Sequence, residues 1–375
     1  MEGHFSGIGH YILGMLRGFD ELVEKSKLEN KPFPKITVVI PYDMVPKYLS
    51  YGLKHLEYKT VPFSFRLMSI LWHRGLMAPL DIFCGKGIYV FTRFVGMPLV
   101  FSKSATIEYD LSYKLFKEYT EERNARFLSK GVAKTVAKSE RVITISNNSK
   151  RELIEHYNCQ ASDIVVAYPA VDQRYFYRRS PKEVAAVKKK YGIKGDYILA
   201  LSNLEPRKNL DGLIDAYCNL PKSVTDKVGL LLVGVDAWKT DKLFAKIMGK
   251  VKAGFNIMRP SEYVSDEDRP AIISGAKMLV YPSHYEGFGM PPLEALACGV
   301  PVITSDNSSL PEAIGNAGTM VNAHDTEGLT KEIERCLAES EKLTRLVIKA
   351  GAEQASKFSW SSSALKIVKA LEEIN

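Results

Sequence analysis

Short runs of apolar, mostly β-branched residues alternate with longer stretches of helical periodicity along the whole chain. The apolar runs are continuous rather than alternating, which is typical of strands that helices cover on both faces, as in parallel sheets. We therefore expect an α/β protein. Strands are predicted at 36–41, 88–91, 98–101, 141–145, 164–168, 197–201, 229–234, 277–281 and 301–304.

The same pattern divides the chain into two domains. Residues 172–181 lack periodicity, a basic helix follows, and a new series of strands and helices begins after Gly195. A length of 375 residues also suits two domains. We place the domains at residues 1–180 and 181–357, and we expect a serine-capped amphipathic helix over 358–375.

The charge is distributed unevenly between the two halves of the chain. Residues 1–190 hold 30 Lys or Arg against 19 Asp or Glu, whereas residues 191–375 hold 21 against 24. A basic first domain indicates an anionic partner such as a membrane surface or nucleic acid, unless its lysines are simply solvated. Residues 63–74 place aromatic and aliphatic side chains beside cations, which suits peripheral membrane contact or an ordinary half-buried helix.

Cysteine usage and hydropathy indicate the compartment. The five cysteines are scattered without C-x-x-C spacing, which favours buried thiols in a reducing compartment. The longest stretch without a charged residue, Gly3–Leu16, is too short to span a membrane. No basic segment precedes an apolar one at the start, so we expect no secretory signal and a cytoplasmic location.

Residues 281–305 carry the most informative pattern. A buried strand is followed by a loop and then by a short helix that starts at Pro291 or Pro292 and ends at Gly299. The unpaired N–H groups at the start of this helix favour an anion or a polar ligand. The loop consists of Gly287, Phe288, Gly289 and Met290.

Two glutamates lie on either side of this loop. Glu286 precedes it, and Glu294 is expected in the first turn of the helix. Paired carboxylates around a glycine loop suit the binding of sugar and ribose hydroxyls. A glutamate in a first turn can also simply offset the helix dipole, so Glu294 alone is ambiguous.

The segment E-G-F-G-M-P-P-L-E-A around these glutamates resembles the signature of the retaining, nucleotide-sugar-dependent glycosyltransferases of family 4, particularly bacterial mannosyltransferase-like members. Further similar segments lie at 141–153, 168–172, 204–210 and 263–268. The resemblance implies the GT-B architecture, in which two Rossmann-like domains face a central cleft. It also implies that the second domain binds the donor and that residues 358–375 cross back to the first domain.

Arg207 and Lys208 are the expected clamp for the leaving nucleoside diphosphate. They follow a predicted strand and open a helix, which is where α/β sheets bind ligands. Adjacent cations there can stabilise the charge that develops on the diphosphate. The resemblance implies that Glu286 binds donor-sugar hydroxyls, that Glu294 binds the ribose, and that the backbone of 287–290 contacts sugar and phosphate.

Residues 6–11 resemble a glycine loop, G-I-G-R-Y, that approaches the donor phosphate from the first domain. Gly7 and Gly9 match, and His10 replaces the usual arginine. The family normally has a strand before this loop, but only Met1–Phe5 precede it here. We therefore expect either that the natural chain starts earlier or that the first sheet lacks a central strand.

A second departure lies at Tyr109 and Asp110, where relatives often carry T-x-H-D-L. Tyr109 replaces the histidine that lies against the donor sugar in the family. The resemblance carries a donor-binding role over to Tyr109 and Asp110.

Several other patterns are interpreted as helix caps rather than sites. Asp266-x-Asp268 matches the metal-binding D-x-D pattern, but Ser265 followed by acidic residues favours an N-cap with an acidic first turn. Ser309-x-x-Glu312 is interpreted as a capping box. The seven histidines show no metal-ligand spacing, so we expect neither a metal nor a cofactor.

The resulting prediction is a retaining hexosyltransferase that uses a nucleotide sugar, with GDP-mannose favoured, in cell-surface polysaccharide synthesis. Its partners would be a glycan or lipid-linked acceptor and an anionic membrane at the inner face of the plasma membrane, with no nucleic acid. One alternative is a GT-B nucleotide-sugar epimerase or phosphorylase, although no pyridoxal-phosphate motif is present. Another is a catalytically silent nucleotide-sugar-binding subunit.

Overall fold

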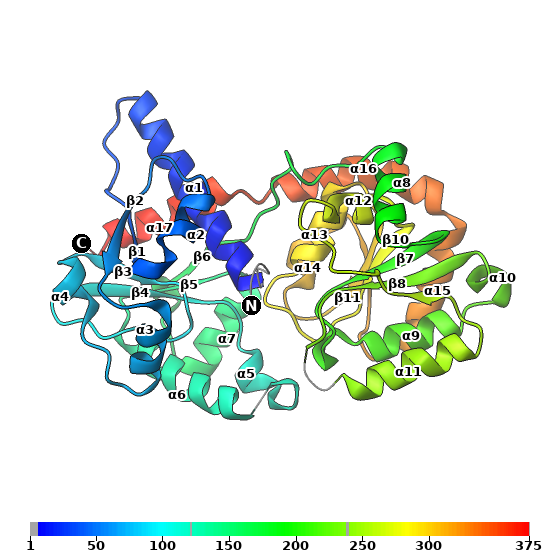
Figure 1. Ribbon diagram of the computed structural model, residues 1–375, viewed down its shortest axis with the longest axis horizontal. Coiled ribbons are helices and arrows are strands. Elements are labelled where there is room, and N and C mark those ends of the chain that lie inside the picture. Colours follow the sequence, from blue (N-terminus) through cyan, green and yellow to red (C-terminus); the bar gives the residue numbers. More distant parts are fainter. Residues whose placement is uncertain (1–6, 121, 238–239, 375) are drawn as a thin grey trace. The chain divides into compact units, whose positions relative to one another are not determined.

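The computed structural model describes residues 7–120, 122–237 and 240–374. The chain forms two compact units (Figure 1). Unit 1 comprises the residues up to Ala170 and the segment from Ser359 onward, and unit 2 comprises Val171–Phe358. Unit 2 thus begins before the expected residue 181, because Arg178 donates to the Gly299 carbonyl at 2.9 Å and the Arg179 N–H to the Ser274 hydroxyl at 3.0 Å.

Unit 1 holds its parallel strands in two sheets, β1-β2 and β3-β4-β5-β6. The strands are β1 (Thr37–Pro41), β2 (Glu57–Val61), β3 (Ile88–Phe91), β4 (Lys103–Glu108), β5 (Arg141–Thr144) and β6 (Ile164–Val166). The helices are α1 (Gly7–Leu28), α2 (Val45–Ser50), α3 (Phe65–His73), α4 (Leu80–Cys84), α5 (Ser112–Leu115), α6 (Glu122–Lys138), α7 (Asn147–Tyr157) and α17 (Trp360–Glu372), with 3₁₀ turns at Tyr42–Met44, Lys117–Tyr119 and Ala161–Asp163.

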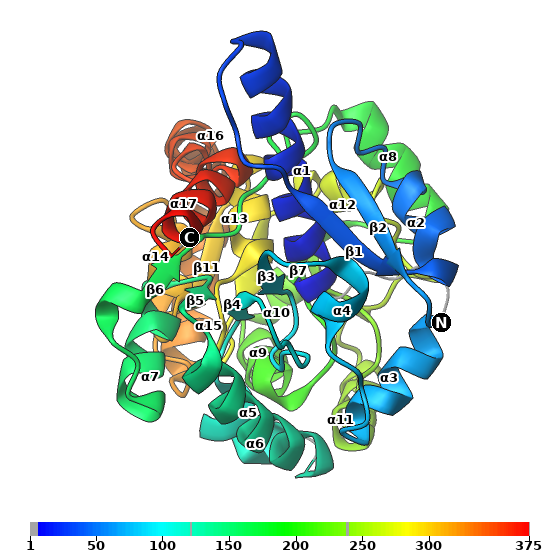
Figure 2. The same cartoon turned by 90° about the vertical axis from the view of Figure 1, so that its left-hand side faces the viewer.

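Helices cover both faces of the four-stranded sheet of unit 1 (Figure 2). On one face α5, α6 and α7 bury Tyr113, Val132 and Leu153 against the sheet. On the other face α17 packs on β5, β6 and α1. The Ser363 hydroxyl on α17 donates to the Tyr168 carbonyl at 2.7 Å, which ties the end of the chain to the loop after β6.

The strands of unit 1 bear on two expectations from the sequence, the missing first strand and the strand at 98–101. Among the described strands, β1 is hydrogen-bonded only to β2 and β3 only to β4, so no described strand joins the two sheets. Residues 1–6 lie outside the described residues. The strand predicted at 98–101 is wrong: these residues form a loop in which Val100 and Phe101 are exposed, and the strand is β4 at Lys103–Glu108.

Unit 2 contains one parallel sheet of order β12-β11-β10-β7-β8-β9. The strands are β7 (Asp196–Leu201), β8 (Val228–Val233), β9 (Ile257–Met258), β10 (Met278–Tyr281), β11 (Val302–Ser305) and β12 (Thr319–Val321). The helices are α8 (Pro181–Lys190), α9 (Leu210–Cys218), α10 (Lys222–Thr225), α11 (Asp241–Lys252), α12 (Arg269–Ser274), α13 (Met290–Ala297), α14 (Leu310–Ile314), α15 (Thr326–Ala338) and α16 (Ser340–Ser356), with a 3₁₀ turn at Pro206–Lys208.

The core of unit 2 explains why its strands have continuous apolar sequences. Helices α9, α11 and α15 bury side chains such as Leu213, Ile247 and Ile333 against one face of the sheet. Helices α8, α12, α13 and α16 contact one another on the other side (Figure 1). With both faces covered, every residue of β10 and β11 is buried.

Candidate active site

The strand order of unit 2 reverses between two neighbouring strands, β7 and β10. Strands β8 and β9 continue on one side of this point, and β11 and β12 on the other. In open parallel sheets, ligands bind beyond the carboxyl ends of the strands at such a reversal. The loop after β7 carries Arg207 and Lys208, and the loop after β10 carries Glu286. The fold therefore brings together residues that lie almost 80 positions apart in the sequence.

Arg207, Lys208 and Glu286 form a compact ion-pair cluster. Lys208 Nζ lies 2.6 Å from Glu286 Oε1, and Arg207 Nη1 lies 3.1 Å from Glu286 Oε2. Arg207 Nη1 also donates to the Tyr285 carbonyl at 2.5 Å. Lys208 and Glu286 are only 8% and 6% exposed. A buried cluster of this kind holds its charged groups in fixed positions, which suits a site that must stabilise developing charge.

The electrostatic balance of the cluster keeps its carboxylate ionised. Burial would raise the pKa of Glu286, but Lys208 and Arg207 lower it to about 2. Burial and the neighbouring Arg207 lower the pKa of Lys208, and Glu286 and Glu205 partly offset that effect. Each charge in the cluster therefore depends on the opposite charges beside it.

Hydroxyl groups from a neighbouring segment fix the loop around Glu286. The Ser309 hydroxyl donates to the Glu286 carbonyl at 2.8 Å, and the Glu286 N–H donates to the Ser308 hydroxyl at 3.0 Å. The capping box predicted for Ser309 and Glu312 is therefore wrong. Ser309 is the N-cap residue of α14, but its side chain binds the Glu286 carbonyl instead of the helix N–H groups.

The glycine loop leads directly into α13, which starts at Met290 and has a proline at its start. Gly289 has φ of 112°, and a Cβ there would lie 2.7 Å from Leu310, so only glycine fits this position without strain. Gly287 is buried. Phe288 is buried against Phe358, with ring centroids 5.2 Å apart, and so anchors the loop in unit 2.

Glu294 lies one turn beyond the start of α13, not in its first turn as expected. The dipole explanation for Glu294 therefore loses force, because that effect fades after the first turn. Glu294 is 4% exposed, with Oε1 3.6 Å from Arg269, and its Oε2 has no hydrogen-bond partner among the described residues. Burial raises its pKa, and Arg269 partly offsets that rise. A buried, unpaired carboxylate oxygen is an acceptor available to a ligand hydroxyl.

The acidic residues of the D-x-D pattern are engaged with neighbouring cations and hydroxyls. Asp268 Oδ2 lies 2.6 Å from Lys190 Nζ and accepts from the Tyr191 hydroxyl at 2.7 Å. Asp266 Oδ1 lies 3.5 Å from Arg269. These residues precede α12 rather than forming its first turn, although Ser265 Oγ accepts from the Asp268 N–H at 3.3 Å. No group of three or more metal-binding side chains occurs in the part of the chain that the structure describes.

The remaining candidate residues belong to unit 1. Gly7 and Gly9 lie in the first turn of α1, so the loop expected over 6–11 is helical from Gly7 onward. Tyr109 is 4% exposed, and its hydroxyl donates to the Thr92 carbonyl at 2.9 Å, so the ring fills the interior of unit 1. Asp110 accepts from the Ser112 N–H at 2.9 Å and shapes the start of α5.

Sequence reasoning missed two residues of the cluster. Glu205 Oε1 lies 2.6 Å from Arg207 Nη2, and Lys208 Nζ donates to the Tyr281 hydroxyl at 3.0 Å. Both are buried. Glu205 and Tyr281 also lie inside segments that the sequence singled out. Their contacts with Arg207 and Lys208, however, depend on how the loops after β7 and β10 meet. A third feature is the pair of stacked rings of His284 and His324, whose centroids lie 4.8 Å apart.

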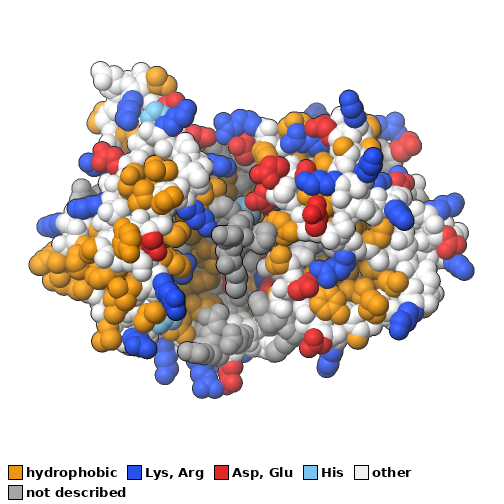
Figure 3. Space-filling model, viewed as in Figure 1, with side chains coloured by type: hydrophobic (Ala, Val, Ile, Leu, Met, Phe, Trp, Pro, Cys, Tyr) orange, Lys and Arg blue, Asp and Glu red, His pale blue; other side chains and the backbone are white. Residues whose placement is uncertain are grey.

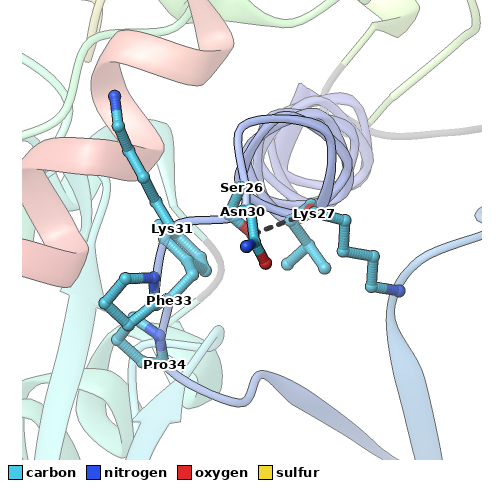
Figure 4. A pocket seen from close by; sticks show the side chains of 8 residues that line it. Ser26, Lys27, Asn30, Lys31, Phe33 and Pro34 are labelled. Atoms are coloured by element: carbon cyan, nitrogen blue, oxygen red, sulfur yellow. Dashed lines mark hydrogen bonds between the residues drawn. The ribbon is translucent and has the colours of Figure 1, made fainter.

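A pocket at the end of α1 belongs to unit 1, whereas the cluster belongs to unit 2. It is lined by Val23, Ser26, Lys27, Asn30, Lys31, Pro32, Phe33 and Pro34 (Figure 4). None of the candidate residues lines it. The candidate active site is therefore the cluster at the strand-order reversal of unit 2.

Comparison with known proteins identifies the family. Residues 184–353 match the family model described as "Glycosyl transferases group 1". O-antigen chain mannosyltransferase B of Escherichia coli is 33% identical over 275 residues, which cover 73% of this chain and 71% of that protein. The chain belongs to the group 1 glycosyltransferases. The matched region of a second relative, the serotype-specific mannosyltransferase WbdA of Escherichia coli, is 29% identical and covers 70% of this chain but 32% of WbdA.

Solved structures show that this glycosyltransferase has the GT-B fold. Anabaena Alr3699/HepE in complex with UDP and glucose covers 99% of the chain with a TM-score of 0.72 at 16% identity. WaaG, a glycosyltransferase involved in lipopolysaccharide biosynthesis, covers 98% with a TM-score of 0.66 at 18% identity. The predicted α/β class, GT-B architecture and glycosyltransferase activity are confirmed.

Proposed function

We propose that this glycosyltransferase transfers mannose from GDP-mannose to a glycan or lipid-linked acceptor in the synthesis of a cell-surface polysaccharide, with retention of configuration as in family 4. The observation that carries this proposal is the buried cluster of Arg207, Lys208 and Glu286 at the strand-order reversal. The mannosyltransferase relatives support mannose as the sugar.

The proposed reaction begins with departure of the diphosphate. The bond between the sugar C1 and the β-phosphate oxygen breaks, and its electron pair stays on that oxygen. The acceptor hydroxyl oxygen forms the new bond to C1 on the same face, and its proton passes to the leaving phosphate. Arg207 and Lys208 stabilise the charge that develops on the phosphate, which lowers the barrier because that charge is greatest in the transition state.

No metal ion or other cofactor takes part in the proposed reaction. The cations Arg207 and Lys208 and the N–H groups at the start of α13 supply positive charge for the diphosphate. The engagement of Asp268 by Lys190 and Tyr191 supports a packing role for the D-x-D residues.

The two glutamates of the motif are proposed to bind hydroxyl groups. Glu286 stays ionised because Lys208 and Arg207 lower its pKa, and it can accept hydrogen bonds from the donor sugar. The unpaired Oε2 of Glu294 can accept one from the ribose. Both residues belong to one unit and to one loop-helix segment, which does not suit a carboxylate nucleophile paired across the scissile bond.

Incubation with GDP-mannose and a membrane extract tests this proposal, with UDP-, dTDP- and ADP-sugars in parallel. Transfer of mannose from GDP-mannose is expected, and proton NMR of the fresh product should show the donor's anomeric configuration. Interconversion of the free nucleotide sugar would instead identify an epimerase, and binding without turnover would identify a silent subunit. An inverted product, or a sugar covalently attached to Glu286 or Glu294, would overturn the mechanism.

We also propose that unit 1 contacts an anionic membrane, which would place the enzyme at the cytoplasmic face of the plasma membrane. Among the described residues, half of the exposed large hydrophobic side chains, ten of twenty, lie between residues 42 and 101. Hydrophobic side chains gather at the surface on the left-hand side of unit 1 (Figure 3). Leu76, Ile82, Val100 and Phe101 are among the most exposed of the ten. We call these four residues the apolar face.

The structure holds part of the apolar face in place. Asp81 on α4 is buried, and its carboxylate accepts from the N–H groups of Val100 and Phe101 at 3.0 and 2.6 Å. The loop therefore presents two apolar side chains outward from a fixed backbone. Residues 42–103 also hold eight Lys or Arg against three Asp or Glu, so the charge around the face complements anionic lipid. No helix within the described residues is long and apolar enough to span a bilayer.

Vesicle flotation tests the membrane proposal. The enzyme is expected to float with phosphatidylglycerol–phosphatidylethanolamine vesicles and not with phosphatidylcholine vesicles. Replacing both Val100 and Phe101 by Ser should abolish flotation, while the matched change of the exposed Leu346 and Ile348 on α16 should not. Equal flotation of the two double variants, or none by the unmodified enzyme, would refute the proposal.

A further inference from the structure

The loop after β7 holds Glu205 rigidly beside Arg207. The Leu204 N–H donates to the Val235 carbonyl at 2.9 Å, and the Lys208 N–H donates to the Glu205 carbonyl at 3.0 Å. Glu205 is 5% exposed, and its side chain lies within 2.6 Å of Arg207 Nη2. The guanidinium group is therefore held from two sides, by Glu205 on one nitrogen and by Tyr285 and Glu286 on the other.

Tyr281 holds Lys208 in a similar way from the end of β10. Its hydroxyl accepts from Lys208 Nζ at 3.0 Å, and Nζ lies 5.2 Å from the centroid of the phenol ring. Tyr281 is 4% exposed, and burial raises its pKa well above the ordinary value, so the phenol is neutral. It therefore orients the ammonium group without neutralising its charge.

We propose that Glu205 and Tyr281 are positioning residues of the donor clamp: Glu205 fixes the Arg207 guanidinium and Tyr281 fixes the Lys208 ammonium where the leaving diphosphate is stabilised. This inference rests on the proposed function of Arg207 and Lys208. Small displacements of preorganised groups cost much of their catalytic effect, so both residues influence turnover without contacting the substrate.

The charges of the cluster give this proposal a distinctive signature. Arg207 and Lys208 carry two positive charges, and Glu205 and Glu286 carry two negative charges. Replacing Glu205 by Gln removes one negative charge near the diphosphate, so binding of free nucleotide does not weaken. Turnover falls, because a neutral amide oxygen holds the guanidinium more weakly than the carboxylate does. A role in folding alone would not separate these two effects.

The pH dependence supplies a second signature. The charged or titratable groups that face Lys208 are Arg207 and Glu205 on its own loop and Tyr281 and Glu286 from β10 and its loop. Burial lowers the pKa of Lys208, and Glu205 raises it. Glu205→Gln therefore lowers that pKa further and moves the alkaline limb of the kcat profile to lower pH. Burial and His324 lower the pKa of His284, so His284 adds no charge in that range.

The test compares Glu205→Gln and Tyr281→Phe with two matched controls elsewhere in unit 2. Asp215→Asn removes the carboxylate that pairs with Lys246 at 2.6 Å, and Tyr217→Phe removes a buried hydroxyl that donates to the Val228 carbonyl at 2.9 Å. GDP-mannose serves as the donor and GDP as the binding probe. The measurements are kcat, KM, the Kd of GDP by calorimetry, the pH profile of kcat and the unfolding midpoint.

Glu205→Gln is expected to lower kcat about 10- to 100-fold without weakening GDP binding and to shift the alkaline limb, and Tyr281→Phe to lower kcat severalfold. The controls should keep wild-type kinetics. If Arg207→Ala and Lys208→Ala retain full turnover, the proposed clamp itself fails. If those variants lose turnover but Glu205→Gln and Tyr281→Phe retain kcat and the pH profile, only this inference is overturned. A kcat that falls merely with the folded fraction also overturns it.

Discussion

At the scale of single residues, Lys208 carries its charge where burial disfavours it. Its ion pair with Glu286 at 2.6 Å compensates both charges. We predict that Lys208→Ala lowers turnover about 10²-fold, the usual cost of removing one preorganised charge contact. The same change should reduce stability, because Glu286 loses a partner while remaining buried. Steady-state kinetics and thermal unfolding measure the two effects.

The direction of the pH effect follows from the lowered pKa of Glu286. A carboxyl group whose folded-state pKa is about 2 contributes stability that is fully present above its ordinary pKa and is lost as the pH falls toward 2. In Lys208→Ala this contribution is smaller. The difference in stability between the variant and the unmodified enzyme should therefore shrink as the pH falls toward 2. The exposed Lys182→Ala is the control, and equal behaviour of the two variants would contradict the assignment.

Glu108 shows the opposite case of a buried carboxyl group without a cation. It is fully buried, burial raises its pKa, and its Oε2 has no hydrogen-bond partner among the described residues. A raised folded-state pKa means that stability is present below the ordinary pKa and is lost as the pH rises through the folded-state pKa. Glu108→Gln should therefore stabilise the protein at pH 8, because the amide cannot ionise and so avoids the cost of placing a charge in the interior.

Chemical denaturation at pH 5 and pH 8 checks this prediction, since the gain should be smaller at the lower pH. Glu118→Gln, which changes an exposed carboxyl group nearby, should have little effect at either pH. A gain in stability that is the same at both pH values would point to packing rather than ionisation.

The sequence predicts the identity of the site residues better than their partners. Arg207, Lys208 and Glu286 could be chosen because a motif and a strand-to-helix position mark them. The hydrogen bond from Ser309 to the Glu286 carbonyl could not be predicted, because a serine just before a helix that starts with a proline also fits a helix cap. Tyr109 is packed against the aromatic rings of Tyr11 and Phe94. Tyr11 lies far from Tyr109 in the sequence, so no local pattern predicts that this side chain is buried.

At the scale of elements, hydropathy alone misplaced one strand. The apolar run at 98–101 was expected to be buried, yet Val100 and Phe101 are exposed, while the more polar β4 at Lys103–Glu108 is a buried strand. Within this strand the Thr106 hydroxyl donates to the Glu108 carboxyl group at 3.3 Å, so two of its buried polar side chains pair with each other. An apolar run without a covering helix does not need to be a strand, and this one supplies half of the apolar face.

Glycines determine how closely α1 and α17 pack. A Cβ at Gly14 would lie 2.2 Å from the ring of Trp360, and one at Gly18 would lie 2.5 Å from the Trp360 carbonyl. We predict that Gly14→Ala destabilises unit 1 by about 1–3 kcal/mol, the usual cost of overpacking.

Gly249 on α11 is the matched comparison for Gly14. It is also helical, but a Cβ at this position would meet no atom within 4 Å, so only helix propensity changes there. Gly249→Ala should stabilise by about 0.5–1 kcal/mol. Thermal unfolding of both variants checks the pair, and a stable Gly14→Ala variant would show that α17 can move away from α1.

At the scale of the whole molecule, the apolar strand pattern was sufficient to predict two sets of parallel strands, but not the division between the units. Residues 172–180 have no periodicity, so nothing local assigns them to either unit. Their hydrogen bonds to Gly299 and Ser274 place them in unit 2. Likewise, the helical pattern of 358–375 predicts a helix without assigning it to a unit. The family resemblance implies that it crosses back to the first domain, and its contacts with α1, β5 and β6 place α17 in unit 1.

Nucleotide binding should act on the two units unequally. The cluster of Arg207, Lys208 and Glu286 and the start of α13 all belong to unit 2, so GDP should slow amide hydrogen exchange in 202–212 and 281–297 more than in the sheet β3–β6 of unit 1. A ligand that binds only the folded state stabilises it by about 2.7 kcal/mol at a concentration 100 times its Kd.

Because protein cations are proposed to neutralise the diphosphate, the protection and the mannosyl transfer should both persist in EDTA. Loss of both on chelation, with recovery on adding Mg²⁺ or Mn²⁺, would instead assign the charge neutralisation to a divalent ion. Protection confined to unit 1 would move the donor site away from the cluster, because a diphosphate held by Arg207 and Lys208 must stabilise the loops that carry them.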